Sequence, residues 1–247
     1  MNQTCQFISY DSQGSDNELT SVTRLIFSIY RQFYVYFVLA FGPINIIANL
    51  LSMFILTRKE LRGSYSSLFL CMTLDHTIVV SLLVATVLKS TFTSNCDPNN
   101  NSLARAIFTI VSQNGMDILR AHASWLAVLI ASLRFWAIRR RGSFIPSLRS
   151  IISWCLLSLL TLVAASTPVF LSTSIQWIPL SQLCRRRNIA DDKLVATVRE
   201  SHWTYYNDCM LLRATYIISG TLYNGIPCLL LFALSILLLR QLRQKSR

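Results

Sequence analysis

Residues 33–56 read FYVYFVLAFGPINIIANLLSMFIL, a run of 24 residues without a charged side chain. A helix needs about 20 mostly apolar residues to cross the hydrocarbon core of a bilayer, so this run predicts a transmembrane helix. Four further stretches have similar length and character, at about 67–88, 106–138, 151–171 and 214–239. The sequence therefore predicts an all-α fold, a polytopic transmembrane helix bundle with five spans.

The composition of the whole chain excludes a soluble protein. Hydrophobic residues make up 53% of the 247 residues and charged residues only 14%, and the mean hydropathy is +0.45. Soluble domains carry about 25% charged residues. The same numbers exclude an intrinsically disordered chain. The net charge of +12 does not indicate nucleic-acid binding, because the basic residues punctuate the apolar stretches instead of gathering in one patch.

Lysine and arginine residues beside the spans predict how the chain crosses the membrane, because they gather on the cytoplasmic side. If the chain crosses five times, three basic segments fall on one side, namely 58–62, 139–149 and 240–247. We therefore expect an extracellular N-terminus over 1–32, a helix bundle over 33–239 and a cytoplasmic tail over 240–247. A multi-pass protein of this orientation is expected in the plasma membrane.

Two kinds of short signal agree with that orientation. Asn2 and Asn100 each begin an Asn-x-Ser/Thr glycosylation sequon in a segment assigned to the outside. Four cysteines also fall outside, where the oxidising compartment favours disulfides: Cys5, Cys96, Cys184 and Cys209. Four cysteines allow three pairings, and the residues themselves do not choose among them. The sequence holds no Cys-x-x-Cys pair or His/Cys cluster, so we expect no metal and no cofactor.

One landmark in each predicted span, in order along the chain, resembles the rhodopsin-like (class A) G-protein-coupled receptors. The landmarks are Asn49, Asp75 in LFLCMTLD, Arg134 in SWLAVLIASLRFWAI, Trp154 and Pro227. Within that family the chain is most similar to receptors for FMRFamide-like neuropeptides. The resemblance covers about residues 33–247, whereas the family has seven spans. It therefore implies five spans of a seven-span receptor architecture, truncated after the fifth.

The chain departs from the family pattern at both ends of the third span. Leu133 stands where the family has an acid that restrains the following arginine in the resting state, so Arg134 needs another partner. The cysteine that the family places at the outer end of this span falls near Thr109. We expect Cys96 to take its place by pairing with Cys184 or Cys209.

The resemblance assigns roles to three of the span residues. Asp75 and Asn49 would belong to an interior polar network that binds sodium, and Arg134 would contact the G protein. A carboxylate in mid-bilayer is costly unless it finds a partner or water, so a hydrogen-bonded structural acid is the alternative for Asp75. An ordinary interfacial anchor is the alternative for Arg134.

Charged residues in the outer half of the third span are candidates for the ligand site. Asp117 and Arg120 are three residues apart, so they share a helix face and could form an ion pair. Ionisable residues inside a membrane are ligand-site candidates, and in the family this stretch lines the ligand pocket. A peptide with an acidic or amidated end suits Arg120.

The leading hypothesis is a receptor and not an enzyme. It senses an extracellular ligand, for which a peptide is the favoured class, and it couples to a heterotrimeric G protein. One alternative is a multi-pass transporter or channel-like protein in which Asp75, His76, Asp117 and Arg120 line a polar path. Transporters often contain repeated groups of spans, and these five spans show no repeat. The other alternative is a truncated receptor that does not signal and modulates a full-length relative.

Overall fold

The computed structural model describes residues 18–58, 64–92, 102–139, 147–183, 194–205 and 209–245. Five helical segments are long and apolar enough, by length and composition, to cross a membrane. They are α1 (Glu18–Leu56), α2 (Ser64–Phe92), α3 (Leu103–Arg139), α4 (Leu148–Ala165) with α5 (Thr167–Leu171), and α7 (Met210–Ile217) with the π-helical η4 (Ile218–Gly225) and α8 (Ile226–Lys245). The helical, membrane-spanning architecture predicted from the sequence is confirmed.

The helices are longer than the apolar runs that predict them. Helix α1 begins at Glu18, well before position 33, and its 39 residues correspond to about 58 Å at 1.5 Å per residue. The hydrocarbon core of a bilayer is only about 30 Å thick. Hydropathy therefore locates the part of each helix that suits lipid, while the backbone hydrogen bonds continue into polar sequence beyond it.

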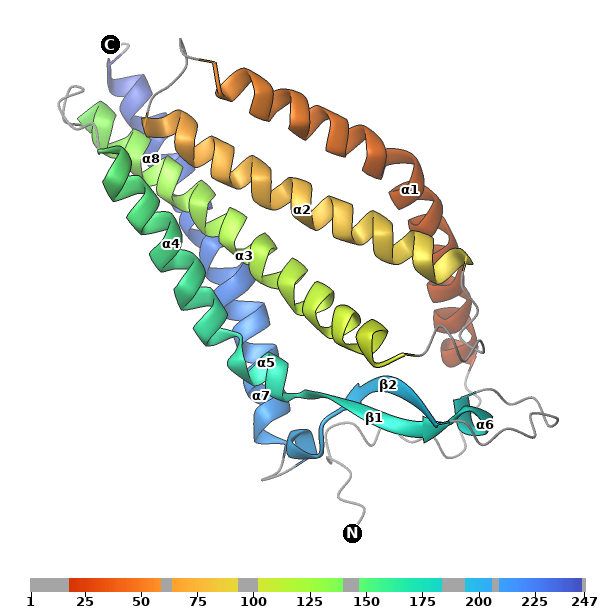
Figure 1. Cartoon of the computed structure of the whole chain (residues 1–247). Coiled ribbons are helices and arrows are strands. Elements are labelled where there is room, and N and C mark those ends of the chain that lie inside the picture. Colours follow the sequence, from red (N-terminus) through yellow and green to blue (C-terminus); the bar gives the residue numbers. More distant parts are fainter. Residues whose placement is uncertain are drawn as a thin grey trace.

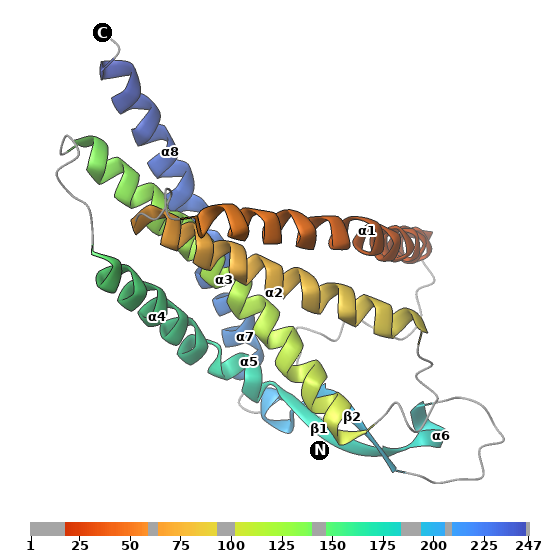
Figure 2. The ribbon, with the colours of Figure 1, turned by 45° about the horizontal axis from the view of Figure 1, so that its top comes forward.

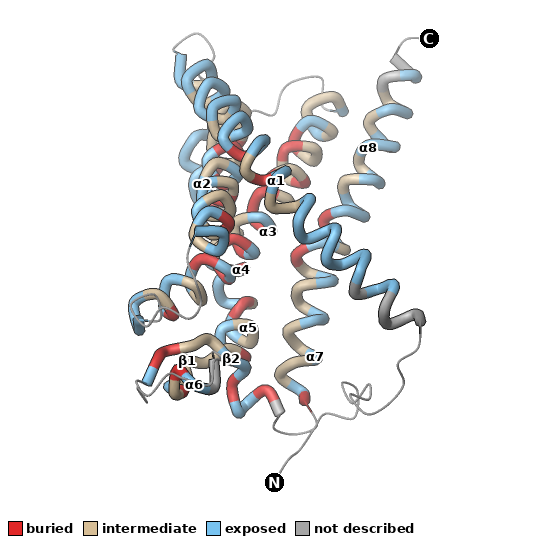
Figure 3. The backbone as a smooth tube through the Cα atoms, turned by 90° about the vertical axis from the view of Figure 1, so that its right-hand side faces the viewer, coloured by how far each residue is buried: buried red, intermediate tan, exposed pale blue. Residues whose placement is uncertain are grey.

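Helix α3 is the centre of the bundle. It packs against α2, α4, η4 and α8, and α1 packs on the far side of α2 (Figure 1). Buried residues, drawn red in Figure 3, occur along α3 from Ala106 to Leu133. In its most apolar window 39% of the residues are buried, against 11–17% in the other four spans. The central position explains why the least apolar span can carry so many polar residues.

The chain crosses the bundle in alternating directions. The last residues of α1, α3 and α8 lie at one end of the bundle, and the strands that follow α5 lie at the other (Figures 1 and 2). Five successive crossings require this arrangement. It places Arg58, Arg139 and Arg240 at a common end, while the assignment of that end to the cytoplasm stays a prediction.

A two-stranded antiparallel sheet lies at the end of the bundle opposite to those segments. Strand β1 (Thr173–Pro179) pairs with β2 (Leu194–Glu200), in a register that runs from Thr173 opposite Glu200 to Pro179 opposite Leu194. The short α6 (Leu180–Leu183) follows β1, and the 3-10 helix η3 (His202–Tyr205) follows β2. This small sheet is an addition to the helix bundle that the sequence predicts. Both strands are rich in β-branched residues, which fit a pleated and half-buried surface.

The sheet is fixed to the helices through the backbone of Ser172. Its carbonyl accepts a hydrogen bond from the Ser201 N–H at 2.8 Å and another from the Thr204 hydroxyl at 3.0 Å. All three residues are buried. Because the start of β1 and the end of β2 meet at one carbonyl, this end of the sheet is held at the residue that directly follows α5.

Candidate functional site

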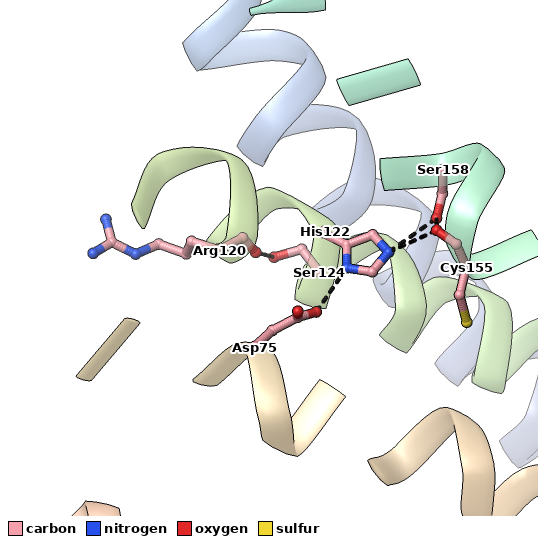
Figure 4. Close-up of polar contacts among 6 residues, drawn as sticks. All are labelled: Asp75, Arg120, His122, Ser124, Cys155 and Ser158. Carbon is pink, nitrogen blue, oxygen red and sulfur yellow. Dashed lines mark hydrogen bonds and ion pairs between the residues drawn. The ribbon is translucent and has the colours of Figure 1, made fainter. Parts of the chain in front are cut away.

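The shortest polar contact between helices in the described part of the chain joins Asp75 of α2 to His122 of α3. The Asp75 Oδ2 and the His122 Nδ1 are 2.7 Å apart (Figure 4). Both residues are buried, with 7% and 4% of their surface exposed. The demand of a mid-bilayer carboxylate for a partner is therefore met by an imidazole that lies 47 residues away in the sequence.

The other ring nitrogen of His122 faces helix α4. The Nε2 lies 3.1 Å from the Cys155 carbonyl and 3.1 Å from the Ser158 hydroxyl; Figure 4 draws both contacts as dashed lines. The Ser158 hydroxyl itself donates to the Cys155 carbonyl at 2.9 Å. One imidazole thus ties α2, α3 and α4 together in the interior of the bundle.

The residue that the resemblance places beside Asp75 makes a different contact. The side-chain amide of Asn49 donates to the Asn45 side chain at 3.0 Å, one turn earlier on α1. Among the described residues no hydrogen bond joins Asn49 to Asp75. His76, which follows the carboxylate in sequence, is exposed, because adjacent helical residues point about 100° apart.

Sequence reasoning did not identify His122 as the partner of Asp75. Both residues fall inside predicted spans, and each is a group that needs a hydrogen-bond partner when it is buried. The only signal available was that shared need. It does not identify the partner, because the pairing depends on how α2 and α3 are packed.

Arg134 lies near the far end of α3, at the wall of an open pocket. Its guanidinium carbon is 5.3 Å from the centroid of the Phe69 ring on α2, a cation–π contact. The pocket has a volume of about 500 Å³ and is lined by Tyr65, Arg134, Ala137, Ile138 and Leu238. A second open pocket of about 270 Å³ shares Arg134 and Leu238 with the first. The aromatic ring of Phe69 is thus the new partner that the sequence required for this arginine.

The preceding position explains why the acid is missing. Leu133 is 5% exposed and belongs to a hydrophobic cluster with Leu68, Leu126 and Ile151. An ionised carboxylate at this position would lose its hydration without a paired charge in that cluster, which is strongly unfavourable. Leucine therefore serves here as a packing residue between α2, α3 and α4.

The predicted charged pair near the middle of α3 is present. The Arg120 Nη1 and the Asp117 Oδ1 are 3.6 Å apart, and the two side chains are 54% and 56% exposed. The buried face of the same turn belongs to a hydrophobic cluster that contains Ile118, Ala121 and Tyr223. The pair therefore lies near the middle of α3, on a face that the cluster does not cover.

Several predicted features rest on residues outside the described ranges. Asn2, Asn100, Cys96 and Cys184 lie there, so glycosylation and the pairing of cysteines stay predictions. Cys209 is disulfide-bonded and buried, with a left-handed backbone (φ 61°) at the start of α7. Within the described ranges, no group of three or more His, Cys, Asp and Glu side chains is placed to hold a metal ion.

Comparison with known proteins gives two matches. The model of the family described as serpentine type 7TM GPCR chemoreceptor Srw matches residues 34–247. The chain is also 24% identical, over 230 residues, to the G-protein coupled receptor dmsr-1 of Caenorhabditis elegans. That alignment covers 89% of this chain and 44% of the relative, so the chain spans less than half of the relative's length.

Proposed function

We propose, from the premise that the chain belongs to the Srw family of serpentine seven-transmembrane G-protein-coupled chemoreceptors, that it senses an extracellular ligand and couples to a heterotrimeric G protein. In this proposal the chain lies in the plasma membrane with residues 1–32 outside the cell. Ligand binding at the outer end shifts the populations of two packing states of the bundle, and one of these states binds the G protein at the inner end.

The observation that carries the proposal is the open pocket beside Arg134. Its walls come from three helices, since Tyr65 belongs to α2, Ala137 to α3 and Leu238 to α8. Apart from the guanidinium of Arg134 and the hydroxyl of Tyr65, the lining side chains are apolar. A groove of this kind suits an amphipathic helix that inserts its apolar face. The C-terminal helix of a G-protein α subunit is the partner that we assign to it.

Arg134 is the residue that we expect to recognise this partner. Within the described ranges it forms no salt bridge and is held by the Phe69 ring alone. A cation–π contact leaves the five N–H donors of a guanidinium available for the carbonyl groups at the end of an incoming helix. A small displacement of α8 relative to α3 would widen the pocket and admit the partner.

Nucleotide exchange on a purified heterotrimer tests the coupling. The receptor is reconstituted in lipid nanodiscs, and the loading of a non-hydrolysable GTP analogue is measured for wild type, R134A and R139A. Arg139 is the matched control, because it is an exposed arginine in the last turn of the same helix. We expect R134A to lose at least about 90% of the exchange activity, a tenfold effect that corresponds to about 1.4 kcal/mol. R139A should stay close to wild type, and equal activity of both variants would remove Arg134 from the coupling site.

We extend the proposal to the ligand, which we take to be a peptide with an amidated or acidic end. The exposed Asp117–Arg120 pair supports this choice, because it presents both signs of charge on an uncovered face of α3. The sheet formed by β1 and β2 packs against α3 as well and offers a long peptide a second surface on the same helix. The class A resemblance to receptors for FMRFamide-like peptides points to the same ligand class.

A matched pair of peptides tests the ligand class. A synthetic peptide that ends in Arg-Phe-amide is compared with its free-acid form in the exchange assay, on wild type, R120A and D117N. We expect the concentration for half-maximal response to rise at least tenfold in R120A, because the charged donor is lost. If neither variant changes the potency of an active peptide, the ligand does not contact this pair.

A further inference from the structure

The resemblance to class A receptors implies a sodium ion beside Asp75, and the atoms around this carboxylate decide whether the ion fits. Sodium is a hard cation that is held by oxygen ligands and attracted by net negative charge. The Asp75 Oδ2 instead faces a ring nitrogen, the His122 Nδ1, at 2.7 Å. A nitrogen that donates a hydrogen bond occupies a position where the ion would need an acceptor.

The contacts of the opposite ring nitrogen determine where one proton lies. The His122 Nε2 faces the Cys155 carbonyl, which can only accept. It also faces the Ser158 hydroxyl, whose hydrogen is directed to that same carbonyl at 2.9 Å. Both neighbours of Nε2 therefore present lone pairs. The Nε2 must carry a hydrogen, which leaves Nδ1 as the nitrogen whose protonation is open.

The 2.7 Å contact between Nδ1 and Oδ2 then requires a second proton. Without it, a lone pair on the nitrogen would face a lone pair on the oxygen at hydrogen-bond distance, which is repulsive. The proton can belong to the imidazole, giving an imidazolium and a carboxylate, or to the acid, giving two neutral groups. In both cases the net charge of the pair is zero.

We propose that the interior acidic site of this chain holds a proton in place of a sodium ion, as an Asp75–His122 pair of zero net charge. Two further titratable groups beside the pair are the thiols of Cys71 on α2 and Cys155 on α4, which interact with one another. Neither thiol adds a negative charge while it is protonated. A sodium ion would have to displace the shared proton and the imidazole, so sodium does not bind at this site and does not change the stability of the receptor.

The inference goes beyond the proposed function and does not depend on it. Its measurement is thermal unfolding of the purified receptor in nanodiscs, in sodium chloride and in N-methylglucamine chloride at equal ionic strength. A ligand that binds only the folded state raises the unfolding temperature by mass action. We expect the wild type to unfold within about 1 °C of the same temperature in the two salts. A sodium-specific rise in the wild type that D75N abolishes would overturn the proposal.

Removal of the imidazole tests whether His122 is the reason that sodium does not bind beside Asp75. In H122S the carboxylate of Asp75 loses its proton-bearing partner and gains a hydroxyl oxygen as a neighbour. We expect this variant to unfold about 3 °C higher in saturating sodium than in N-methylglucamine. H76S is the matched control, because His76 is adjacent in sequence and exposed, and it should remain indifferent. A folded H122S that ignores sodium would contradict the role given to the imidazole, and the wild-type comparison decides the proposal if H122S does not fold.

Discussion

The indole Nε1 of Trp125 donates a hydrogen bond at 3.1 Å to the backbone carbonyl of Leu222, the carbonyl that Pro227 leaves without its helical donor. In the π-helical turn η4 each N–H bonds five residues back, as the Ile226 N–H does with the Thr221 carbonyl. The next N–H would belong to residue 227 and would bond to Leu222, but proline has none. A side chain of α3 therefore completes the backbone of the fifth span.

Replacement of Trp125 by phenylalanine should destabilise the bundle, because the Leu222 carbonyl is then left unpaired. The expected loss is about 1–3 kcal/mol in the free energy of unfolding, read as a lower unfolding temperature in nanodiscs. W177F is the control, since Trp177 lies on β1 with 55% of its surface exposed. The P227A background sharpens the test. There an alanine N–H can reach Leu222, so the W125F loss should shrink, and an unchanged loss would refute the assignment.

The packing of α1 on α2 should depend on a glycine. A Cβ atom at Gly42 would collide with the Cγ2 of Val84, whereas a Cβ at Gly115 would meet nothing within 4 Å. We expect G42A to lower stability by about 1–3 kcal/mol through overpacking. G115A should raise it by up to about 1 kcal/mol, because alanine is the better helix former. Thermal unfolding of both variants checks the contrast. Adding V84A to G42A should restore the lost stability, because the shorter side chain removes the collision.

The Asp75–His122 pair should show strong coupling in a double-mutant cycle. D75A and H122A each leave a buried polar partner unsatisfied, at an expected cost of about 2–4 kcal/mol in the free energy of unfolding. The double variant removes both groups and should lose clearly less than the sum of the two single losses. Chemical or thermal unfolding of the four proteins measures the coupling energy. Additive losses would show that the two side chains do not depend on each other.

The orientation of the chain can be checked through its sequons. If residues 1–32 and the segment around Asn100 face the outside, both sequons enter the secretory lumen and accept glycans. N2Q and N100Q should each remove one step from the glycosidase-sensitive shift on a denaturing gel, and the double variant should remove the shift. A wild-type protein without any such shift, expressed in eukaryotic cells, would speak against the predicted orientation.

Much of the fold could be predicted from the sequence, because crossing a bilayer is a local requirement. A run such as 33–56 must satisfy its backbone polar groups internally, so it can only be helical. The Asp117–Arg120 pair was likewise predictable from its spacing along one helix, and the structure contains it. The strands at 173–179 and 194–200 were not predicted. Both strands lie between the apolar runs, where hydropathy gives no signal, and their pairing joins segments that are distant in sequence.

The sequence by itself determined the five helices, the alternating charge of their ends and the need of Asp75 for a partner. Only the tertiary structure decided that the partner is His122, that Phe69 holds Arg134 and that Trp125 completes the backbone at Leu222. The physical reason is the range of the interactions. Helix formation and membrane insertion depend on neighbouring residues. The partner of a buried polar group depends on which helix faces meet, and packing between distant segments sets those faces.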